Sequence, residues 1–360
     1  MDAEVLVEFT RGPLVEAVHR GHAAVVDSAG RLLAWLGNPD HICFMRSSAK
    51  PLQILPLLED RLDERFGFTD EELAVMAASH TGEERHVRTV ARILARLGLD
   101  ERALRCGVHP PENEAAYLRL RLLGGEPGPL HNNCSGKHAA MLAIALAGGH
   151  PLESYPEPDH PVQQRILQVI REMTGVADPI LGIDGCGVPV FGLPLRAMAL
   201  AYARLIDPAE LPARRAAACR RATAAMRAHP GMVSGEGCLG EALMPATRGR
   251  LVVKGGAEGL IAVGVEAPAT PDGRGVGVVL KMEDGSGGDR AIRPALLELL
   301  SQLGFLQPEE RAALAAHDFG PVRNCLGQVV GESRPAFRVH KHAAEQASYP
   351  RATTSSRAER

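Results

Sequence analysis

Segments with the alternating apolar pattern of β-strands lie at the two ends of this chain, whereas helix-like segments fill the middle. The strand-like stretches near the N-terminus are EVLVEF, GHAAVVD and RLLAWLG. Those in the C-terminal third are RLVVKGG, EGLIAVGVEA and GVGVVLKMED. Residues 28–30 form a short glycine-bearing link between the second and third stretches, which is typical of a β-hairpin. The sequence therefore predicts an α+β fold in which both termini build one antiparallel sheet.

The same pattern predicts how the chain is divided. We expect one unit over residues 1–335 with two lobes, a sheet lobe from about 1–45 plus 250–335 and a helical lobe from about 46–249 inserted into it. Helices are expected near 50–61, 70–79, 84–97, 136–147, 161–174, 208–228 and 290–303. Residues 336–360 have little apolar periodicity, so we predict a disordered tail there.

The composition indicates a soluble protein that acts on a small molecule. The 360 residues are 45% hydrophobic and carry a formal net charge of −3, without the excess of Lys and Arg that nucleic acids or anionic membranes attract. The longest apolar stretch, residues 139–147, is far shorter than the roughly 18 residues of a membrane span. The seven scattered cysteines favour reduced thiols, and the N-terminus does not resemble a secretory signal. We therefore expect a cytoplasmic protein.

The stretch RSSAKP places a hydroxyl group and an amine three residues apart. Ser47 and Lys50 would share one face of a helical turn, where the amine can take the proton of the hydroxyl. Pro51 is tolerated in the first turn of a helix, which puts Ser47 at or just before a helix start, beside N–H groups that stabilise an oxyanion. A serine N-cap followed by an exposed lysine has the same spacing, so the spacing alone leaves both interpretations open.

A second serine and a second lysine occur at the ends of predicted elements. Ser79 lies where a helix gives way to a loop, and Lys254 lies where a strand meets two glycines that would let a ligand approach the backbone. A helix-end serine and a strand-edge lysine without function would look the same. A lysine acts as a general base only when burial or a nearby cation lowers its pKa, and two lysines in one pocket would lower each other's pKa.

Two glycine-bearing motifs offer soft metal ligands. HNNCSGKH carries Cys134 and Lys137 at a spacing that can share one helical face, and IDGCG carries Cys186 beside Asp184. Thiolates are good ligands for zinc, although structural zinc sites normally have four closely spaced Cys or His residues. Two buried thiols flanked by glycine turns are the competing interpretation.

An ordered set of motifs resembles one enzyme family. The motifs, found between about residues 5 and 335, are RSSAKP, ASHTGEERH, CGVHPP, HNNCSGKHAAML, GIDGCGVP, GEGCLGEAL and VVKGGAEG. Together they resemble the rhizobial-type (AnsA-like) L-asparaginases of the asparaginase II family. The resemblance implies a fold like that of serine β-lactamases and penicillin-binding proteins, a homodimer, and hydrolysis of L-asparagine to L-aspartate and ammonia.

The resemblance also implies roles for individual residues. The two Ser–Lys pairs of the family correspond here to Ser47, Lys50, Ser79 and Lys254. Its zinc ligands correspond to Cys134, Lys137 and Cys186. Water would take the fourth position on the zinc and leave it open to substrate. Residues expected beside the metal or the substrate are Asp184, Asn133 and His138, with Asp184 a candidate contact for the substrate amine.

These residues predict an amidohydrolase in which a serine, activated by a neutral lysine, attacks the side-chain amide carbon and forms an acyl-enzyme. Ser47 with Lys50 is the favoured pair, but Ser79 with Lys254 could take the role. Zinc would orient the α-amino and carboxylate groups of the substrate. Glutamine stays open as a second substrate, because one methylene group changes binding by only about 1–3 kcal/mol.

Two other functions are compatible with the same residues. One is a different acyl-serine hydrolase on the same scaffold, with β-lactamase or peptidase activity, although the Ser-Asp-Asn element expected there is missing. The other is a non-catalytic protein that binds zinc or an amino acid.

Overall fold

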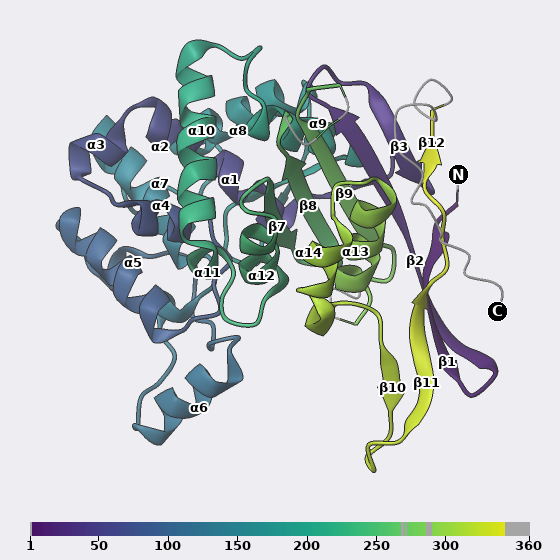
Figure 1. The fold of residues 1–360 in the computed structure, drawn as a ribbon. Helices are drawn as coiled ribbons and strands as arrows, with labels where there is room; N and C mark the ends of the chain where they lie inside the picture. The colour runs from purple at the N-terminus through teal and green to yellow at the C-terminus, as the bar shows by residue number, and fades with distance from the viewer. Residues whose placement is uncertain (1, 268–269, 271, 286–289, 343–360) are drawn as a thin grey trace.

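The computed structural model describes residues 2–267, 270, 272–285 and 290–342, and its largest element is a sheet built from both ends of the chain (Figure 1). Its strands are β1 (Glu4–Arg11), β2 (Leu14–Asp27), β3 (Leu32–Leu36), β7 (Leu251–Gly256), β8 (Leu260–Val265), β9 (Val276–Met282), β10 (Pro321–Arg323), β11 (Val329–Pro335) and β12 (His340–Lys341). The order is β10–β11–β1–β2–β9–β8–β7, with every described pairing antiparallel. The predicted α+β class and its antiparallel sheet are confirmed.

Strand β2 connects the parts of this sheet because its two halves have different partners. Its first half, through Gly21, pairs with β1 and is mostly exposed to solvent. Its second half pairs with both β3 and β9 and is fully buried. The predicted hairpin of residues 21–37 is thereby confirmed, with the backbone N–H of Gly30 donating to the carbonyl oxygen of Asp27 in the turn.

The last described residues belong to the sheet. Strand β12 pairs with β3, with His340 opposite Trp35, and the Phe337 side chain is buried. The predicted disordered tail is therefore wrong for residues 336–342, because Phe337 and the β12 backbone find partners on the sheet. The rest of that predicted tail, 343–360, lies outside the described residues.

Helices fill the middle of the chain, as the sequence predicted. They are α1 (Lys50–Gln53), α2 (Leu55–Glu59), α3 (Leu62–Phe66), α4 (Asp70–Met76), α5 (Glu84–Arg96), α6 (Glu114–Leu122), α7 (Ser135–Gly148), α8 (Pro161–Thr174), α9 (Leu195–Ile206), α10 (Ala213–Ala228), α11 (Pro230–Val233) and α12 (Leu239–Ala246). The C-terminal helices are α13 (Ile292–Gln302) and α14 (Pro308–Ala312). Short 3-10 turns are η1 (Arg46–Ala49), η2 (Glu101–Ala103), η3 (Pro129–His131) and η5 (Ala315–His317).

Some boundaries differ from the predictions for identifiable reasons. The helix predicted over residues 50–61 is divided at Ile54, because Pro56 has no N–H to donate and its ring cannot follow a continuous helical turn. Helix α4 begins at a capping box in which Thr69 and Glu72 satisfy each other's backbone N–H groups, as its acidic first turn suggested.

One sheet and several helices were not predicted, the helices being α3, α6, α9, α11, α12 and α14. Helix α9 packs against β2, β8 and β9, and eight of its twelve residues are buried. The strands of the small sheet, in the order β4–β6–β5, are β4 (Ile42–Phe44), β6 (Pro189–Pro194) and β5 (Ile180–Ile183). Such short strands give little alternation to read. They nevertheless matter, because β4 leads directly into Ser47 and β5 into Cys186.

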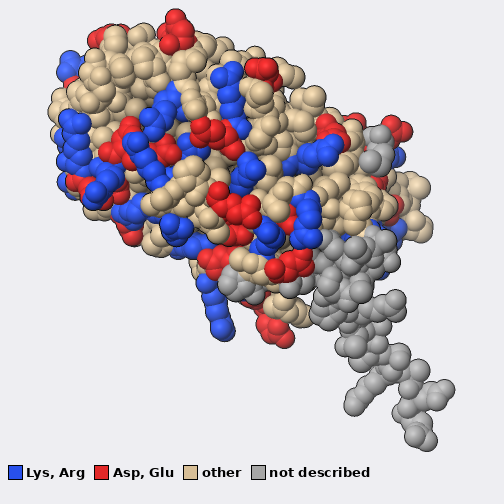
Figure 2. Space-filling view, turned by 90° about the horizontal axis from the view of Figure 1, so that it is seen from above, with Lys and Arg blue, Asp and Glu red and all other residues tan. Residues whose placement is uncertain are grey.

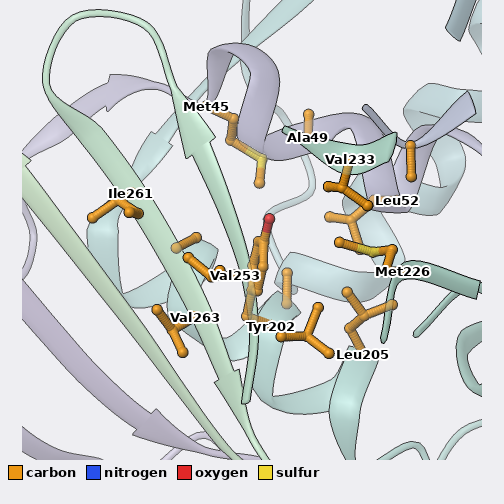
Figure 3. Packing of buried hydrophobic residues seen from close by; sticks show 14 of the residues in the cluster. Met45, Ala49, Leu52, Tyr202, Leu205, Met226, Val233, Val253, Ile261 and Val263 are labelled. Carbon is orange, nitrogen blue, oxygen red and sulfur yellow. The ribbon is translucent and has the colours of Figure 1, made fainter. Parts of the chain in front are cut away.

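The core joins the sheet to the helices around Tyr202. This side chain of α9 is fully buried, and its hydroxyl donates a hydrogen bond of 2.7 Å to the backbone carbonyl of Ser48. Figure 3 shows its ring beside Val253 of β7, with the oxygen directed toward the turn that carries Met45 and Ala49. The core therefore holds η1, and with it Ser47 and Lys50, against α9.

We expect Tyr202→Phe to lower the free energy of unfolding by about 1–3 kcal/mol, because it removes a buried hydrogen bond and leaves the Ser48 carbonyl without that donor. Urea unfolding at equilibrium would measure the change. Tyr117→Phe is the matched control, since Tyr117 lies on α6 with 37% of its surface exposed. Equal unfolding midpoints for the two variants would contradict this assignment.

The surface seen in Figure 2 carries Lys and Arg side chains interspersed with Asp and Glu. This view shows no extended patch of one sign, in keeping with the small net charge of −3. Among the described residues, no helix is both long and apolar enough to cross a membrane.

Candidate active site

A pocket of about 290 Å³ lies between strands β7 and β8 of the large sheet and the loops of the helical part. Its lining residues are Ser47, Ser79, Thr81, Glu112, Asn133, Ser234, Cys238, Leu239, Gly240, Val253, Lys254, Gly255, Gly256, Ala257, Leu260, Ile261, Ile292 and Arg293. Four of the ten residues singled out from the sequence are among them: Ser47, Ser79, Asn133 and Lys254. The elements that carry these four come from distant parts of the chain.

Ser47 is presented at the start of a helical segment, as predicted. It lies in η1, which continues into α1, and Arg46 before it has a positive φ of 49°, a conformation that a residue with a side chain adopts at some cost. The adjacent Ser48 is fully buried and donates its hydroxyl to the carbonyl of Met45 at 2.7 Å. Of the two neighbouring serines, Ser47 is therefore the one that faces the pocket.

The predicted pairing of Ser47 with Lys50 is not what the structure contains. The Lys50 side chain is fully buried, and its amine donates to the Ser79 hydroxyl at 2.7 Å and to the Asn133 carbonyl at 3.2 Å. The Lys50 backbone N–H donates to the Ser47 carbonyl, but among the described residues no hydrogen bond joins the Lys50 amine to the Ser47 hydroxyl. The spacing in sequence placed the two residues near each other, but the Lys50 side chain extends inward, to where α4 ends.

Ser79 lies between the two lysines. It lies three residues after the end of α4, and its backbone N–H donates to the Val233 carbonyl, which fixes the loop. Its Oγ is 2.7 Å from Lys50 Nζ and 2.9 Å from Lys254 Nζ. The Ser79 hydroxyl is thus in contact with Lys254, the partner that the resemblance implied, and also with Lys50, which had been expected beside Ser47.

The two amines differ in their surroundings. Burial lowers the pKa of Lys254 well below its usual value, and the neighbouring Lys50 lowers it further. Lys254 Nζ also donates to the carbonyl of Gly255 at 2.8 Å. A neutral Lys254 keeps a lone pair that can accept the Ser79 proton, while Lys50 donates to the same oxygen. This is the arrangement that activates a serine as a nucleophile.

The two cysteines and the lysine of the glycine-bearing motifs lie together. Lys137 Nζ is 3.0 Å from Cys186 Sγ, and all three side chains are buried. A hydrogen bond from Cys186 lowers the pKa of the Cys134 thiol well below its usual value. Burial opposes the charge on Lys137, but the sulfur atoms of Cys134 and Cys186 more than offset it, so the pKa of Lys137 is raised. The pair of thiols therefore carries negative charge, balanced by the Lys137 amine.

Close packing brings this group to the pocket. Helix α7, which carries Lys137, approaches α4 so closely at Gly136 that a Cβ there would lie 2.1 Å from the Val75 carbonyl oxygen. The residue before α7 is Cys134, whose Sγ lies 3.1 Å from Asn133 Oδ1. Asn133 lines the pocket and Lys50 contacts its backbone, so the thiols and the two lysines form one continuous site.

The three residues expected beside the metal or substrate differ in position. Asn133 lines the pocket. Asp184 is engaged elsewhere, because its Oδ1 is 2.9 Å from Arg46 Nε and also accepts from the Gly185 N–H. His138 does not line the pocket: it is fully buried, and its Nδ1 is 2.6 Å from the Tyr155 hydroxyl. Burial lowers the pKa of His138 well below its usual value, so it is neutral.

Several pocket residues were not identified from the sequence. Glu112, Thr81, Ser234 and Arg293 line the pocket, yet none was a candidate. The motif CGVHPP ends at Pro111, one residue short of Glu112. A lone glutamate in a loop carries no spacing that would have pointed to it.

With this geometry established, comparisons with known proteins identify the family. The model of the family described as L-asparaginase II matches residues 7–335, a range that includes all ten residues singled out from the sequence. This chain belongs to the asparaginase II family. The family is named for the hydrolysis of a linear amide, which is the activity that the sequence predicts. No curated protein matches this asparaginase II family member in sequence.

Among solved structures, this asparaginase II family protein is similar to Mglu. The match to Mglu in its glutamate form has a TM-score of 0.44 and 15% identity, and covers 80% of this chain and 62% of that one. The match to its native form has a TM-score of 0.44 and 14% identity, and covers 80% and 66%. The asparaginase II chain thus spans slightly less than two thirds of the Mglu chain.

Proposed function

We propose that this enzyme hydrolyses L-asparagine to L-aspartate and ammonia with Ser79 as the nucleophile and Lys254 as its base. The observation that carries the proposal is the position of the Ser79 hydroxyl, 2.7 Å from Lys50 Nζ and 2.9 Å from Lys254 Nζ. This reverses the preference for Ser47 with Lys50 that the sequence suggested. Ser47, which lines the same pocket, is left to donate a hydrogen bond to the substrate.

The proposed reaction has two halves. Ser79 Oγ attacks the side-chain amide carbon of the substrate while the Ser79 proton moves to Lys254 Nζ. The Lys50 amine donates a hydrogen bond to the amide oxygen of the substrate, which develops negative charge. Lys254 then gives the proton to the leaving nitrogen, ammonia departs, and an ester links Ser79 to the aspartyl group. In the second half Lys254 takes a proton from water, water attacks the ester carbon, and aspartate leaves as Ser79 regains its proton.

The test is the release of ammonia from asparagine and from glutamine, measured side by side on the same preparation. We expect asparagine to be hydrolysed with the higher kcat/KM. Turnover of a β-lactam without ammonia release would favour the other acyl-serine hydrolase. Tight asparagine binding without hydrolysis would favour a non-catalytic binding protein. Either result would contradict the proposal.

We also propose that Cys134, Lys137 and Cys186 hold a zinc ion. Two sulfur atoms and one nitrogen converge in a buried site, which suits zinc in donor type, and zinc binding would release the proton from the Lys137 amine. Two thiols and an amine are fewer ligands than a structural site uses. Among the described residues, no cluster of three or more His, Cys, Asp or Glu side chains could hold a metal. A bound zinc would supply a positive charge that attracts the substrate carboxylate.

The metal content of the purified protein tests this assignment. We expect about one zinc per chain by mass spectrometry of the metal, and a loss of most of it in Cys186→Ser, because a hydroxyl is a far weaker zinc ligand than a thiolate. Cys219→Ala is the matched control, since Cys219 is a buried cysteine of α10 outside the site. Equal zinc contents in the two variants, or none in the unaltered protein after zinc is supplied, would refute the site.

Three broader expectations complete the proposal. We place the chain with the rhizobial AnsA-like members of the family, on a scaffold related to serine β-lactamases, supported by the motifs and by the antiparallel sheet with its inserted helices. We propose a homodimer, which light scattering would detect as twice the chain mass. We propose a cytoplasmic location, supported by the seven cysteines, all of which lie in the described residues and form no disulfide there.

A further inference from the structure

The sequence assigned the substrate amine to Asp184, but the structure engages that carboxylate with Arg46 and leaves it off the pocket wall. Glu112 is the single acidic residue among those that line the pocket, where the charged groups are otherwise Lys254 and Arg293. Its Oε1 accepts a hydrogen bond of 2.6 Å from Asn133 Nδ2, and no other partner of its carboxylate occurs in the described part of the chain. Oε2 is therefore available to a ligand in the pocket.

The Glu112 backbone is fixed to the loop that carries Ser79. The residue after it, Asn113, donates its backbone N–H to the Thr81 carbonyl at 3.0 Å. The residue before it, Pro111, packs on Gly82 so closely that a Cβ at Gly82 would lie 2.8 Å from Pro111 Cα. Gly82 also has a positive φ of 74°. Proline and these contacts limit the movement of the backbone, so the Glu112 side chain starts from a fixed point on the loop that borders Ser79.

The charges around the nucleophile create a need for such a carboxylate. The α-amino group of a free amino acid is protonated near neutral pH, and it would enter a site that already contains the Lys50 and Lys254 amines. A cationic substrate group that approached these amines without an anion would be repelled. Glu112 is close enough to Lys254 for its negative charge to act on the pKa of that lysine, in the direction that raises it. It is thus placed to neutralise a cation next to Ser79.

We infer that Glu112 binds the α-ammonium group of the substrate and so selects free α-amino acid amides over amides without an amino group. The inference rests on the proposed amidohydrolase function and adds the class of substrate to it. Asn133 acts as a positioning residue, because its amide holds Oε1 of Glu112 and its backbone carbonyl holds Lys50. Removing the charge at residue 112 should weaken recognition of the amino group, while Ser79 keeps its contacts with both lysines.

The test compares L-asparagine with succinamate, which is asparagine without its α-amino group. The unaltered enzyme should prefer asparagine in kcat/KM by on the order of 100-fold. Glu112→Gln should lower kcat/KM for asparagine by about 10- to 100-fold, mostly through KM, because a charge-assisted hydrogen bond is lost equally from the bound substrate and the transition state. Its kcat/KM for succinamate should change by less than about threefold. Glu112→Asp should restore part of the preference.

Glu114→Gln is the matched control, since Glu114 is exposed at the start of α6, two residues away, and does not line the pocket. It should leave both substrates unaffected. Equal losses for both substrates in Glu112→Gln, or no preference for asparagine in the unaltered enzyme, would overturn the inference while leaving the amidohydrolase function intact. Failure of the unaltered protein to release ammonia from either substrate would instead remove the proposed function, and the inference with it.

Discussion

Replacement of Ser79 by alanine should lower kcat for asparagine hydrolysis by about 10⁴-fold or more, whereas Ser47→Ala should lower it by no more than about 100-fold. Ser79 is the serine whose hydroxyl contacts both amines, so its removal eliminates the nucleophile and the site of proton transfer together. Among the described residues, no hydrogen bond joins the Ser47 hydroxyl to either amine, so the loss of this hydroxyl costs only a hydrogen bond to the substrate. Ammonia release under saturating asparagine would measure both effects.

Ser234→Ala serves as the control for Ser79→Ala. Ser234 lines the same pocket, and no hydrogen bond joins its hydroxyl to either lysine in the described structure. Activity within about tenfold of the unaltered enzyme is expected for this variant, and similar thermal unfolding of all three variants would exclude loss of the fold. Rapid quenching with asparagine should add an aspartyl group to the peptide that contains Ser79. Its appearance on the peptide with Ser47, or a larger loss in Ser47→Ala, would return the nucleophile to Ser47.

The sequence was sufficient for the sheet and most helices because their apolar periods are long and regular. Strands β8 and β9 are buried runs bounded by turn residues, and α5 and α8 have one apolar face. The small sheet β4–β6–β5 was missed because strands of three to six residues give little alternation. Helix α9 and the shorter helices between the predicted ranges were missed as well. Their positions follow from tertiary packing, which a single sequence does not display.

The residues of the site were predictable, but their connections were not. The motifs singled out both serines, both lysines and both thiols, and the structure brings all of them into one region. The favoured partner of Lys50 was nevertheless its neighbour in sequence, Ser47. A lysine side chain can reach several ångströms in any direction that packing allows, so only the positions of α4 and β7 decide that it meets Ser79 instead. Glu112 was missed for the same reason.

The proximity of the two lysine amines determines which of them acts as the base. If both amines were solvated, each would carry a proton near neutral pH and neither could act as a base. Burial of Lys254 beside Lys50 makes a second charge unfavourable, and the pKa of Lys254 falls as a result. Lys50 has two acceptors for its donors, Ser79 Oγ and the Asn133 carbonyl, and is near the negatively charged thiols. Lys254, whose pKa is lowered, is therefore the amine that acts as the base.

If Lys254 is the general base, Lys254→Ala should lower kcat/KM by about 10³-fold, which is within the range typical of a missing general base. In the unaltered enzyme kcat/KM should rise with pH as Lys254 loses its proton, and reach its plateau well below pH 10.5, the usual pKa of a lysine, because the pKa of Lys254 is lowered. This rising part of the profile of kcat/KM against pH, the rising limb, should be absent in Lys254→Ala. A small primary amine added to the solution should restore part of the activity, because truncation leaves room for it beside Ser79.

Lys50→Met tests the effect of Lys50 on the base, because it removes a charge that lowers the pKa of Lys254. The residual activity of this variant should have its rising limb at higher pH than in the unaltered enzyme. Lys281→Met is the matched control, since Lys281 is a buried lysine of β9 that does not line the pocket; its limb should not move. A limb that stays in place in Lys50→Met, or persists in Lys254→Ala, would assign the titration to another group and would mean that Lys254 is not the base.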